Sequence, residues 1–304
     1  MDRCAPDYAN GTVTCFSDRA LMNIINAYNA SHADKIQLTS GARKRDIWEA
    51  IQQKMSDKCG KDEACWINQG FLKKLQPDLE QYFKPLAPLG QYQWLSTDDI
   101  YNVMSQYDRK HKDFKFVGPL PMDFLRLRDK DSLYLQGLDL NRERSKGLKN
   151  IGVIFNMDPS TKGGSHWIAL NIDLLRNEIH YFDSYGAKYT EPNEDMLPYY
   201  DSYGQYNRGA RIPMPKDIQK FVFKTMMRMT GEKGKKAMQV GGKMKMPYKL
   251  RINSIQHQYA NSECGVYSML FLLKSRNNSF EQIAQDIITD EVANQARNHL
   301  FRRK

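Results

Sequence analysis

The sequence lacks the features that mark several large classes of protein. No apolar run approaches the roughly 18 residues of a membrane-spanning helix, so an integral membrane protein is not expected. The opening stretch, "MDRCAPDYANGTVTCF", has no apolar core of a secretory signal, so we expect the N-x-S/T triplets at Asn10, Asn29 and Asn277 to stay unmodified. Internal repeats and long low-complexity tracts are also missing. We therefore expect a folded, non-secreted protein, long enough at 304 residues for one large domain or two smaller ones.

Cysteine is scarce in the chain. The five cysteines are Cys4, Cys15, Cys59, Cys65 and Cys264. An odd number in a chain without a secretory signal predicts free thiols in a reducing compartment. The spacings C-x10-C and C-x5-C among the first four do not match common zinc sites. The alternatives for these four cysteines are a zinc site with His32 as a further ligand and a disulfide.

Acidic residues are outnumbered by basic ones, 35 to 45, which gives a formal net charge of +10. Such an excess suits nucleic acid or an acidic partner, but it is also ordinary solubility charge. It is concentrated in residues 233–251, "KGKKAMQVGGKMKMPYKLR", which contain no acid. This segment is interpreted either as a solvated loop or as a contact for DNA or an acidic precursor. Its Gly-Gly pair also allows a hypothesis of self-cleavage after Gly242.

The spacing of apolar residues predicts an α+β fold with a helical module in front. Helical periodicity runs from residue 17 to about 76, and the proline-broken stretch 83–93 is the best candidate for a boundary. We therefore expect an accessory module over 1–87 and a second domain over 88–304. In the second domain, strand-like runs are expected at 114–118, 151–157, 166–173, 178–185 and 250–258. Helices are expected at 96–107, at 214–229 and from 263 to the end.

Cys264 lies where a polar stretch, "NSE", meets an apolar helical run. Ser262 is expected to cap this helix. A helix N-terminus favours a thiolate over a thiol, so Cys264 is a candidate nucleophile. Gly265 would leave space beside an attacked carbonyl, and the amide of Gln258 could donate to an oxyanion. The alternative is a structural cysteine in the core and a surface glutamine.

A base and an orienting acid are available in "SHWIALNIDLLRNEIHYFDSYG". Two strand patterns around a polar break predict an antiparallel hairpin. A two-residue loop at Leu174-Leu175 would place His166 directly opposite Asp183 on one face of the sheet. The other histidines fit the base role less well. His180 alternates to the opposite face, His257 has no matching carboxylate, and His32, His111 and His299 lie in charged helices or loops.

These motifs resemble the SUMO-specific and adenovirus-type cysteine protease clan. The resemblance rests on "HW" at a strand, "FDS" on the next strand and "Q-x5-CG" opening an apolar helix, in the order His, Asp, Cys. "WLSTDDIYNVMSQY" is similar to the clan's Trp-Leu-Asn-Asp helix start, although Ser96-Thr97 replaces Asn-Asp. "IQHQYANSECGVYS" and the tail "ITDEVANQARNHLFR" resemble the polyprotein-processing proteases of large DNA viruses such as African swine fever virus. The likeness covers roughly residues 94–304.

The resemblance implies a papain-like cysteine protease core without metal or cofactor, in which a mixed sheet carrying His and Asp packs on the cysteine helix. It implies Cys264 as nucleophile, His166 as base, Asp183 as orienting acid and Gln258 as oxyanion donor. It also implies that Trp94 and Trp167 flank a Gly-Gly substrate tail. The expected function is cleavage after Gly-Gly in viral structural precursors, in the virion and host cytoplasm. A deconjugating isopeptidase for SUMO or ubiquitin-like modifiers and a catalytically silent scaffold or DNA-binding protein are the alternatives.

Overall fold

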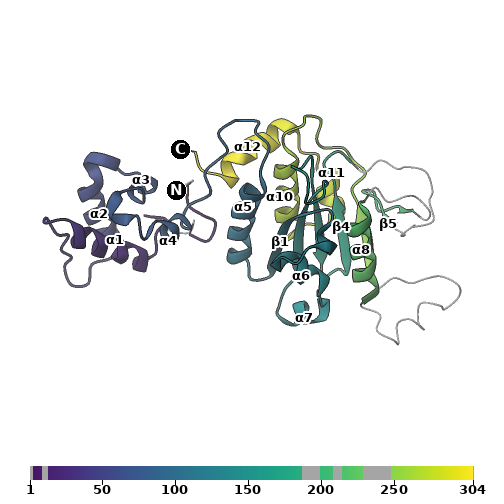
Figure 1. The fold of residues 1–304 in the computed structure, drawn as a ribbon, viewed down its shortest axis with the longest axis horizontal. Coiled ribbons are helices and arrows are strands. Elements are labelled where there is room, and N and C mark those ends of the chain that lie inside the picture. The colour runs from purple at the N-terminus through teal and green to yellow at the C-terminus, as the bar shows by residue number, and fades with distance from the viewer. Residues whose placement is uncertain (1–2, 9–12, 187–198, 208–213, 229–247, 304) are drawn as a thin grey trace. The chain divides into compact units, whose positions relative to one another are not determined.

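The computed structural model describes residues 3–8, 13–186, 199–207, 214–228 and 248–303 (Figure 1). The chain forms two compact units: one comprises Met1–Ala87 with Asn298–Lys304, and the other comprises Pro88–Arg297. The C-terminal segment, which we expected in the second domain, therefore belongs to the first unit. Among the described helices, none has the length and apolarity needed to cross a membrane.

The first unit is helical. Its elements are α1 (Asp18–Ser31), α2 (Lys44–Cys59), α3 (Glu63–Trp66), the 3-10 turn η1 (Gly70–Leu72) and α4 (Gln76–Glu80). α1 begins after Ser17, whose hydroxyl accepts from the backbone N–H of Ala20 and so caps the helix. The expected helical periodicity is interrupted towards its end, because the chain leaves α3 after Trp66 and turns again at Gly70. Trp66 and Phe16 are fully buried among the apolar faces of these helices.

Two disulfides cross-link the first unit, which corrects our expectation of free thiols. Cys4 is bonded to Cys15, and Cys59 is bonded to Cys65. Cys264 is the free cysteine. No group of three or more His, Cys, Asp or Glu side chains able to hold a metal occurs in the described part of the chain. The disulfide alternative therefore replaces both the free-thiol and the zinc interpretations for these four residues.

The second unit is built on a seven-stranded mixed sheet with strand order β1-β2-β3-β4-β7-β5-β6. The strands are β1 (Phe114–Pro121), β2 (Asn150–Asn156), β3 (Trp167–Asp173), β4 (Glu178–Phe182), β5 (Tyr199–Tyr200), β6 (Tyr206–Asn207) and β7 (Lys249–Ile252). The helices are α5 (Thr97–Lys110), α6 (Lys130–Gln136), α7 (Leu140–Ser145), α8 (Lys216–Arg228), α10 (Cys264–Ser275), α11 (Phe280–Gln285) and α12 (Asp290–Leu300), with the 3-10 turn η2 (Phe124–Arg126). The end of α12, from Asn298 on, is counted in the first unit. The predicted α+β class is confirmed.

Helices cover both faces of this sheet (Figure 1). On one face, side chains of α8 such as Phe221 join a buried cluster with Leu170 of β3 and Tyr181 of β4. On the other face, Phe271 of α10 stacks on Phe182 of β4 with ring centroids 4.5 Å apart. Strands covered on both sides read as almost continuous apolar runs, as β2 and β3 do.

The β3–β4 hairpin has a longer loop than expected. Asp173 pairs with Glu178, so four residues form the loop rather than Leu174-Leu175 alone. The Asp173 carboxylate accepts from the backbone N–H groups of Leu175 and Arg176, and Asn177 takes a positive φ of 55°. The register is therefore shifted by two residues from the predicted one. Because side chains alternate with a period of two, this shift preserves the face on which each side chain lies.

Candidate active site

Cys264 is the first residue of α10 and is 3% exposed. The residue before the helix is Glu263, and no side chain caps the helix, so the expected cap by Ser262 is wrong. A Cβ on Gly265 would lie 3.2 Å from the Leu95 side chain and 3.3 Å from that of Ile100. Gly265 therefore lets the start of α10 pack closely against α5 and the residue before it, a packing role rather than the open space that we expected.

Glu263 forms a buried ion pair directly beside the cysteine. Its carboxylate lies 2.8 Å from the Arg297 guanidinium on α12 and also accepts from Asn294 at 3.1 Å and from the Ser262 hydroxyl at 3.1 Å. Both ionic side chains are at most 9% exposed. The guanidinium neutralises a negative charge that would otherwise disfavour a thiolate at the neighbouring residue.

His166 and Asp183 meet at the end of the sheet where β3 begins and β4 ends. The His166 Nε2 atom lies 2.8 Å from Asp183 Oδ1, and the His166 side chain also hydrogen-bonds Cys264. Burial lowers the pKa of His166, but hydrogen bonds to Asp183 and Cys264 and the charges of both groups raise it, to about 9. The site therefore favours the imidazolium form of His166.

Gln258 is fully buried close to this pair, not on the surface. Its carboxamide oxygen accepts from the Ser184 hydroxyl at 2.7 Å, and its Nε2 atom donates to the Ala260 carbonyl at 2.7 Å. The backbone N–H groups of His257 and Gln258 both donate to the Ser184 carbonyl at 2.8 Å. Ser184 thus fixes both the backbone and the side chain of Gln258.

Ser184 and Asn253 are positioning residues that our sequence reasoning missed. Asn253 donates from Nδ2 to the Asp183 carbonyl at 2.8 Å and to the Ile255 carbonyl at 2.9 Å. Gly186 allows the backbone after Asp183 to pass close to the backbone of residues 255 and 256, since a Cβ on Gly186 would lie 2.9 Å from it. The "FDS" motif could have pointed to Ser184, because the serine directly after Asp183 is part of that motif. Asn253 carried no local signal.

The two predicted substrate tryptophans lie on connected segments. Trp94 is 46% exposed, whereas Trp167, next to His166, is 6% exposed. The Trp167 indole N–H donates to the backbone carbonyl of Leu95 at 2.9 Å. The α5 cap that follows uses Ser96 and Asp99 reciprocally, so serine performs the capping role despite its departure from the clan's Asn-Asp pattern.

Three other histidines, His32, His180 and His257, pack or hydrogen-bond within the fold. His180 is fully buried and bonded to Glu178 and Asn171, and His257 contacts the Ala284 carbonyl at 3.1 Å. Burial lowers the pKa of His257, despite that hydrogen bond. His32 stacks on Tyr28 with centroids 4.0 Å apart in the first unit.

Most of the basic segment 233–251, with the proposed cleavage point after Gly242, lies outside the described residues. Of its described members, Arg251 is paired with Glu178 at 2.8 Å and with Glu281 at 2.7 Å. Its side chain is 12% exposed, so Arg251 belongs to an internal network and not to a solvated basic loop.

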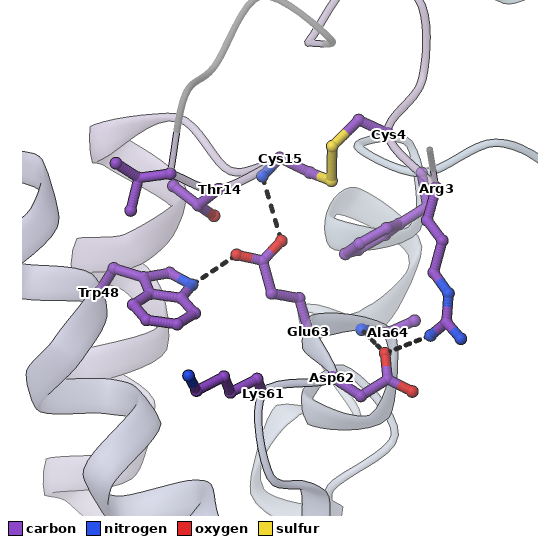
Figure 2. Close-up of a pocket in the computed structure, with 11 residues that line it drawn as sticks. Arg3, Cys4, Thr14, Cys15, Trp48, Lys61, Asp62, Glu63 and Ala64 are labelled. Atoms are coloured by element: carbon purple, nitrogen blue, oxygen red, sulfur yellow. Dashed lines mark hydrogen bonds and ion pairs between the residues drawn. A yellow bond between two sulfur atoms is a disulfide. The ribbon is translucent and has the colours of Figure 1, made fainter. Parts of the chain in front are cut away.

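The first unit has a hollow of about 340 Å³ beside the Cys4–Cys15 disulfide (Figure 2). In its wall, the Glu63 carboxylate accepts from the Trp48 indole at 2.6 Å and from the backbone N–H of Cys15 at 3.1 Å. Burial raises the pKa of Glu63, although these hydrogen bonds act to lower it. Because both oxygens are occupied, the carboxylate ties the N-terminal segment to α2 and α3.

Residues 139–303, more than half of the chain, match the model of the Ulp1 protease family, C-terminal catalytic domain. The chain belongs to the Ulp1 protease family. It is a thiol protease, and the cysteine, histidine and acid just described all lie within the matched part.

Viral proteases are among the relatives of this Ulp1-family chain. It is 26% identical to the putative thiol protease R355 of Acanthamoeba polyphaga mimivirus, over 99% of this chain and 94% of that protein. It is 25% identical to the SUMO-1 cysteine protease of African swine fever virus, over 85% of this chain and 89% of that protein. A crystal structure of the African swine fever virus protease superposes with a TM-score of 0.59 at 19% identity, covering 99% of this chain and 96% of the other. The structural similarity supports the fold.

Proposed function

We propose that this Ulp1-family thiol protease is an endopeptidase that uses Cys264 as nucleophile, His166 as general base and acid, and Asp183 as the orienting acid. The observation that carries the proposal is the 2.8 Å contact between His166 Nε2 and Asp183, beside the free Cys264 at a helix start. This arrangement matches the requirement for a nucleophile held next to an oriented base.

The reaction needs no group that the chain does not carry. The Cys264 thiolate attacks the substrate carbonyl, and the backbone N–H of Cys264 and the Gln258 amide stabilise the oxyanion. The His166 imidazolium then donates its proton to the leaving amine, which leaves a thiol ester. Water, deprotonated by neutral His166, hydrolyses this thiol ester and regenerates the pair. Asp183 keeps the imidazole facing the sulfur throughout.

The substrate that we propose is a Gly-Gly-X site in viral structural precursors, cleaved during virion maturation. A pair of glycines has no side chains, and we propose that Trp94 and Trp167 flank it on the way to Cys264. The relation to viral thiol proteases over nearly the full chain supports this choice. Residues 1–87 are proposed as an accessory module of the catalytic domain. A contact of the 233–251 segment with DNA or an acidic precursor stays a prediction.

A deconjugating isopeptidase is the second candidate, because one relative is named a SUMO-1 cysteine protease. The test compares kcat/KM for a Gly-Gly-X peptide with that for a SUMO or ubiquitin-like modifier joined to a lysine side chain. Faster peptide cleavage that is lost in Cys264→Ala supports the endopeptidase. Preference for the conjugate would replace it by the isopeptidase, and cleavage that survives in Cys264→Ala would refute both.

A further inference from the structure

Tyr185 contacts both halves of the proposed active site. Its ring stacks on the His166 imidazole with centroids 4.8 Å apart and planes 29° from parallel. Its backbone N–H donates at 2.9 Å to Asp183 Oδ1, the same oxygen that contacts His166 Nε2. The aromatic face and the orienting carboxylate therefore hold the imidazole from two directions.

The hydroxyl of Tyr185 reaches the proposed oxyanion donor. It donates to the Ala260 carbonyl at 3.2 Å, and Gln258 Nε2 lies 3.4 Å from the hydroxyl oxygen. The same Nε2 atom donates to the Ala260 carbonyl at only 2.7 Å. One amide hydrogen is thus firmly bound, and the other makes a long, weak contact with the hydroxyl. That second hydrogen can be given to an oxyanion at little cost.

Ala260, whose carbonyl accepts both of these bonds, is itself held in place. Asp290 Oδ2 accepts from the backbone N–H of Tyr259 at 2.9 Å and of Ala260 at 2.8 Å. Burial raises the pKa of Tyr185, and the negative charges of Cys264, Asp183 and Asp290 raise it further. The hydroxyl therefore keeps its proton at neutral pH and remains a donor to Ala260.

We propose that Tyr185 is a positioning residue for catalysis. Its ring keeps the His166 imidazole facing Cys264, and its hydroxyl, by donating to the Ala260 carbonyl, holds the acceptor that orients the Gln258 carboxamide. The inference rests on the roles proposed above for His166 and Gln258. It assigns Tyr185 an effect on kcat that is exerted through these two residues.

The test uses the full chain and a Gly-Gly-X peptide, with the variants Tyr185→Phe and Tyr185→Leu. The control is Tyr203→Phe, because Tyr203 is 65% exposed. Tyr185→Phe should lower kcat about fivefold with KM unchanged, as expected for loss of a hydrogen bond worth about 1 kcal/mol. Tyr185→Leu should lower kcat further and move the basic limb of the pH profile to lower pH, because the ring no longer stabilises the imidazolium. Tyr203→Phe should match the unmodified chain.

A double-mutant cycle separates this inference from the proposed function. If the hydroxyl acts through Gln258, Tyr185→Phe should cause little further loss in a Gln258→Ala background. Full additivity, unchanged kcat in Tyr185→Phe, or a change confined to the melting temperature would each overturn the inference. Wild-type kcat in Gln258→Ala or His166→Ala would instead refute the proposed function itself.

Discussion

The indole N–H of Trp167 donates to the backbone carbonyl of Leu95 across 72 residues of sequence. This bond joins the start of β3, next to His166, to the segment that precedes α5. Leu95 in turn packs over Gly265, beside Cys264. Leu95, which follows the exposed Trp94, therefore contacts the residue after His166 and the residue after Cys264.

Trp167→Phe should raise KM about fivefold, since it removes a hydrogen bond worth about 1 kcal/mol that fixes the 94–95 backbone, while kcat changes less. Steady-state kinetics on a Gly-Gly-X peptide measure this split. The matched control is Trp48→Phe, which loses a comparable indole bond, to Glu63 in the first unit. It should lower stability and leave KM for a short peptide unchanged. Equal effects of the two changes on KM would contradict the assignment of Trp167.

His166→Ala should lower kcat/KM about 10³-fold, because it removes the general base and the partner of the thiolate. Asp183→Asn should cost less, about tenfold, because an amide oxygen can still accept from the imidazole N–H. Cys264→Ala should abolish cleavage and leave the circular dichroism spectrum unchanged. If Asp183→Asn costs as much as His166→Ala, the carboxylate does more than orient the imidazole.

The raised pKa of His166 predicts a basic limb in the pH profile. Hydrolysis needs the imidazolium to protonate the leaving amine, so kcat/KM should fall as the pH rises through about 9. Asp183 raises this pKa, and Asp183→Asn should therefore move the limb to lower pH. A limb that stays in place in this variant would assign it to another group.

The same pKa makes a prediction for stability. The folded-state pKa of His166 lies above the unfolded value of 6.5, so the contribution of this group is full below about pH 6.5 and is lost as the pH rises through about 9. Urea unfolding from pH 6 to 10 should show this loss in the unmodified chain. The loss should be smaller in Cys264→Ala, since the thiolate is one cause of the shift. Identical pH dependence in both would contradict the pairing.

The sequence predicted those features of the fold that local patterns encode. Strands β2 and β3 follow from periodicity, and the start of α10 at Cys264 follows from the boundary between a polar and an apolar stretch. The hairpin loop was misjudged because Asp173 caps it with its side chain and Asn177 adopts a left-handed conformation. The register is shifted by two residues, an even number, so His166 and Asp183 still lie on the same face and in contact.

The parts that the sequence did not predict depend on residues far apart in the chain. Ser184 and Gln258 form a hydrogen bond although 74 residues separate them, and Glu263 pairs with Arg297 on a later helix. No periodicity or spacing encodes such pairs, because they arise only when separate elements pack. Disulfide pairing has the same origin: Cys4 and Cys15 are brought to a Cα distance of 5.2 Å by the fold of the first unit.

Arg297→Met should destabilise the second unit by about 3–5 kcal/mol, because it leaves the buried Glu263 carboxylate unpaired beside Cys264. The control is Lys274→Met. Its 2.7 Å bond to Asp286 is about as short as the 2.8 Å bond between Arg297 and Glu263, but the Asp286 side chain is 66% exposed, so a cost of at most about 1 kcal/mol is expected. Urea unfolding measures both. Similar costs for the two variants would mean that burial does not determine the strength of these pairs.

The disulfides predict how many thiols can be labelled. Iodoacetamide added to the denatured, unreduced chain should attach once, at Cys264, and after reduction it should attach at all five cysteines. Cys264→Ala should give no adduct without reductant and four with it, as intact-mass spectrometry can count. Reduction should also lower the stability of the first unit, by roughly 2–4 kcal/mol for each bond. Three or more adducts on the unreduced, unmodified chain would show that at least one of the two cross-links is absent.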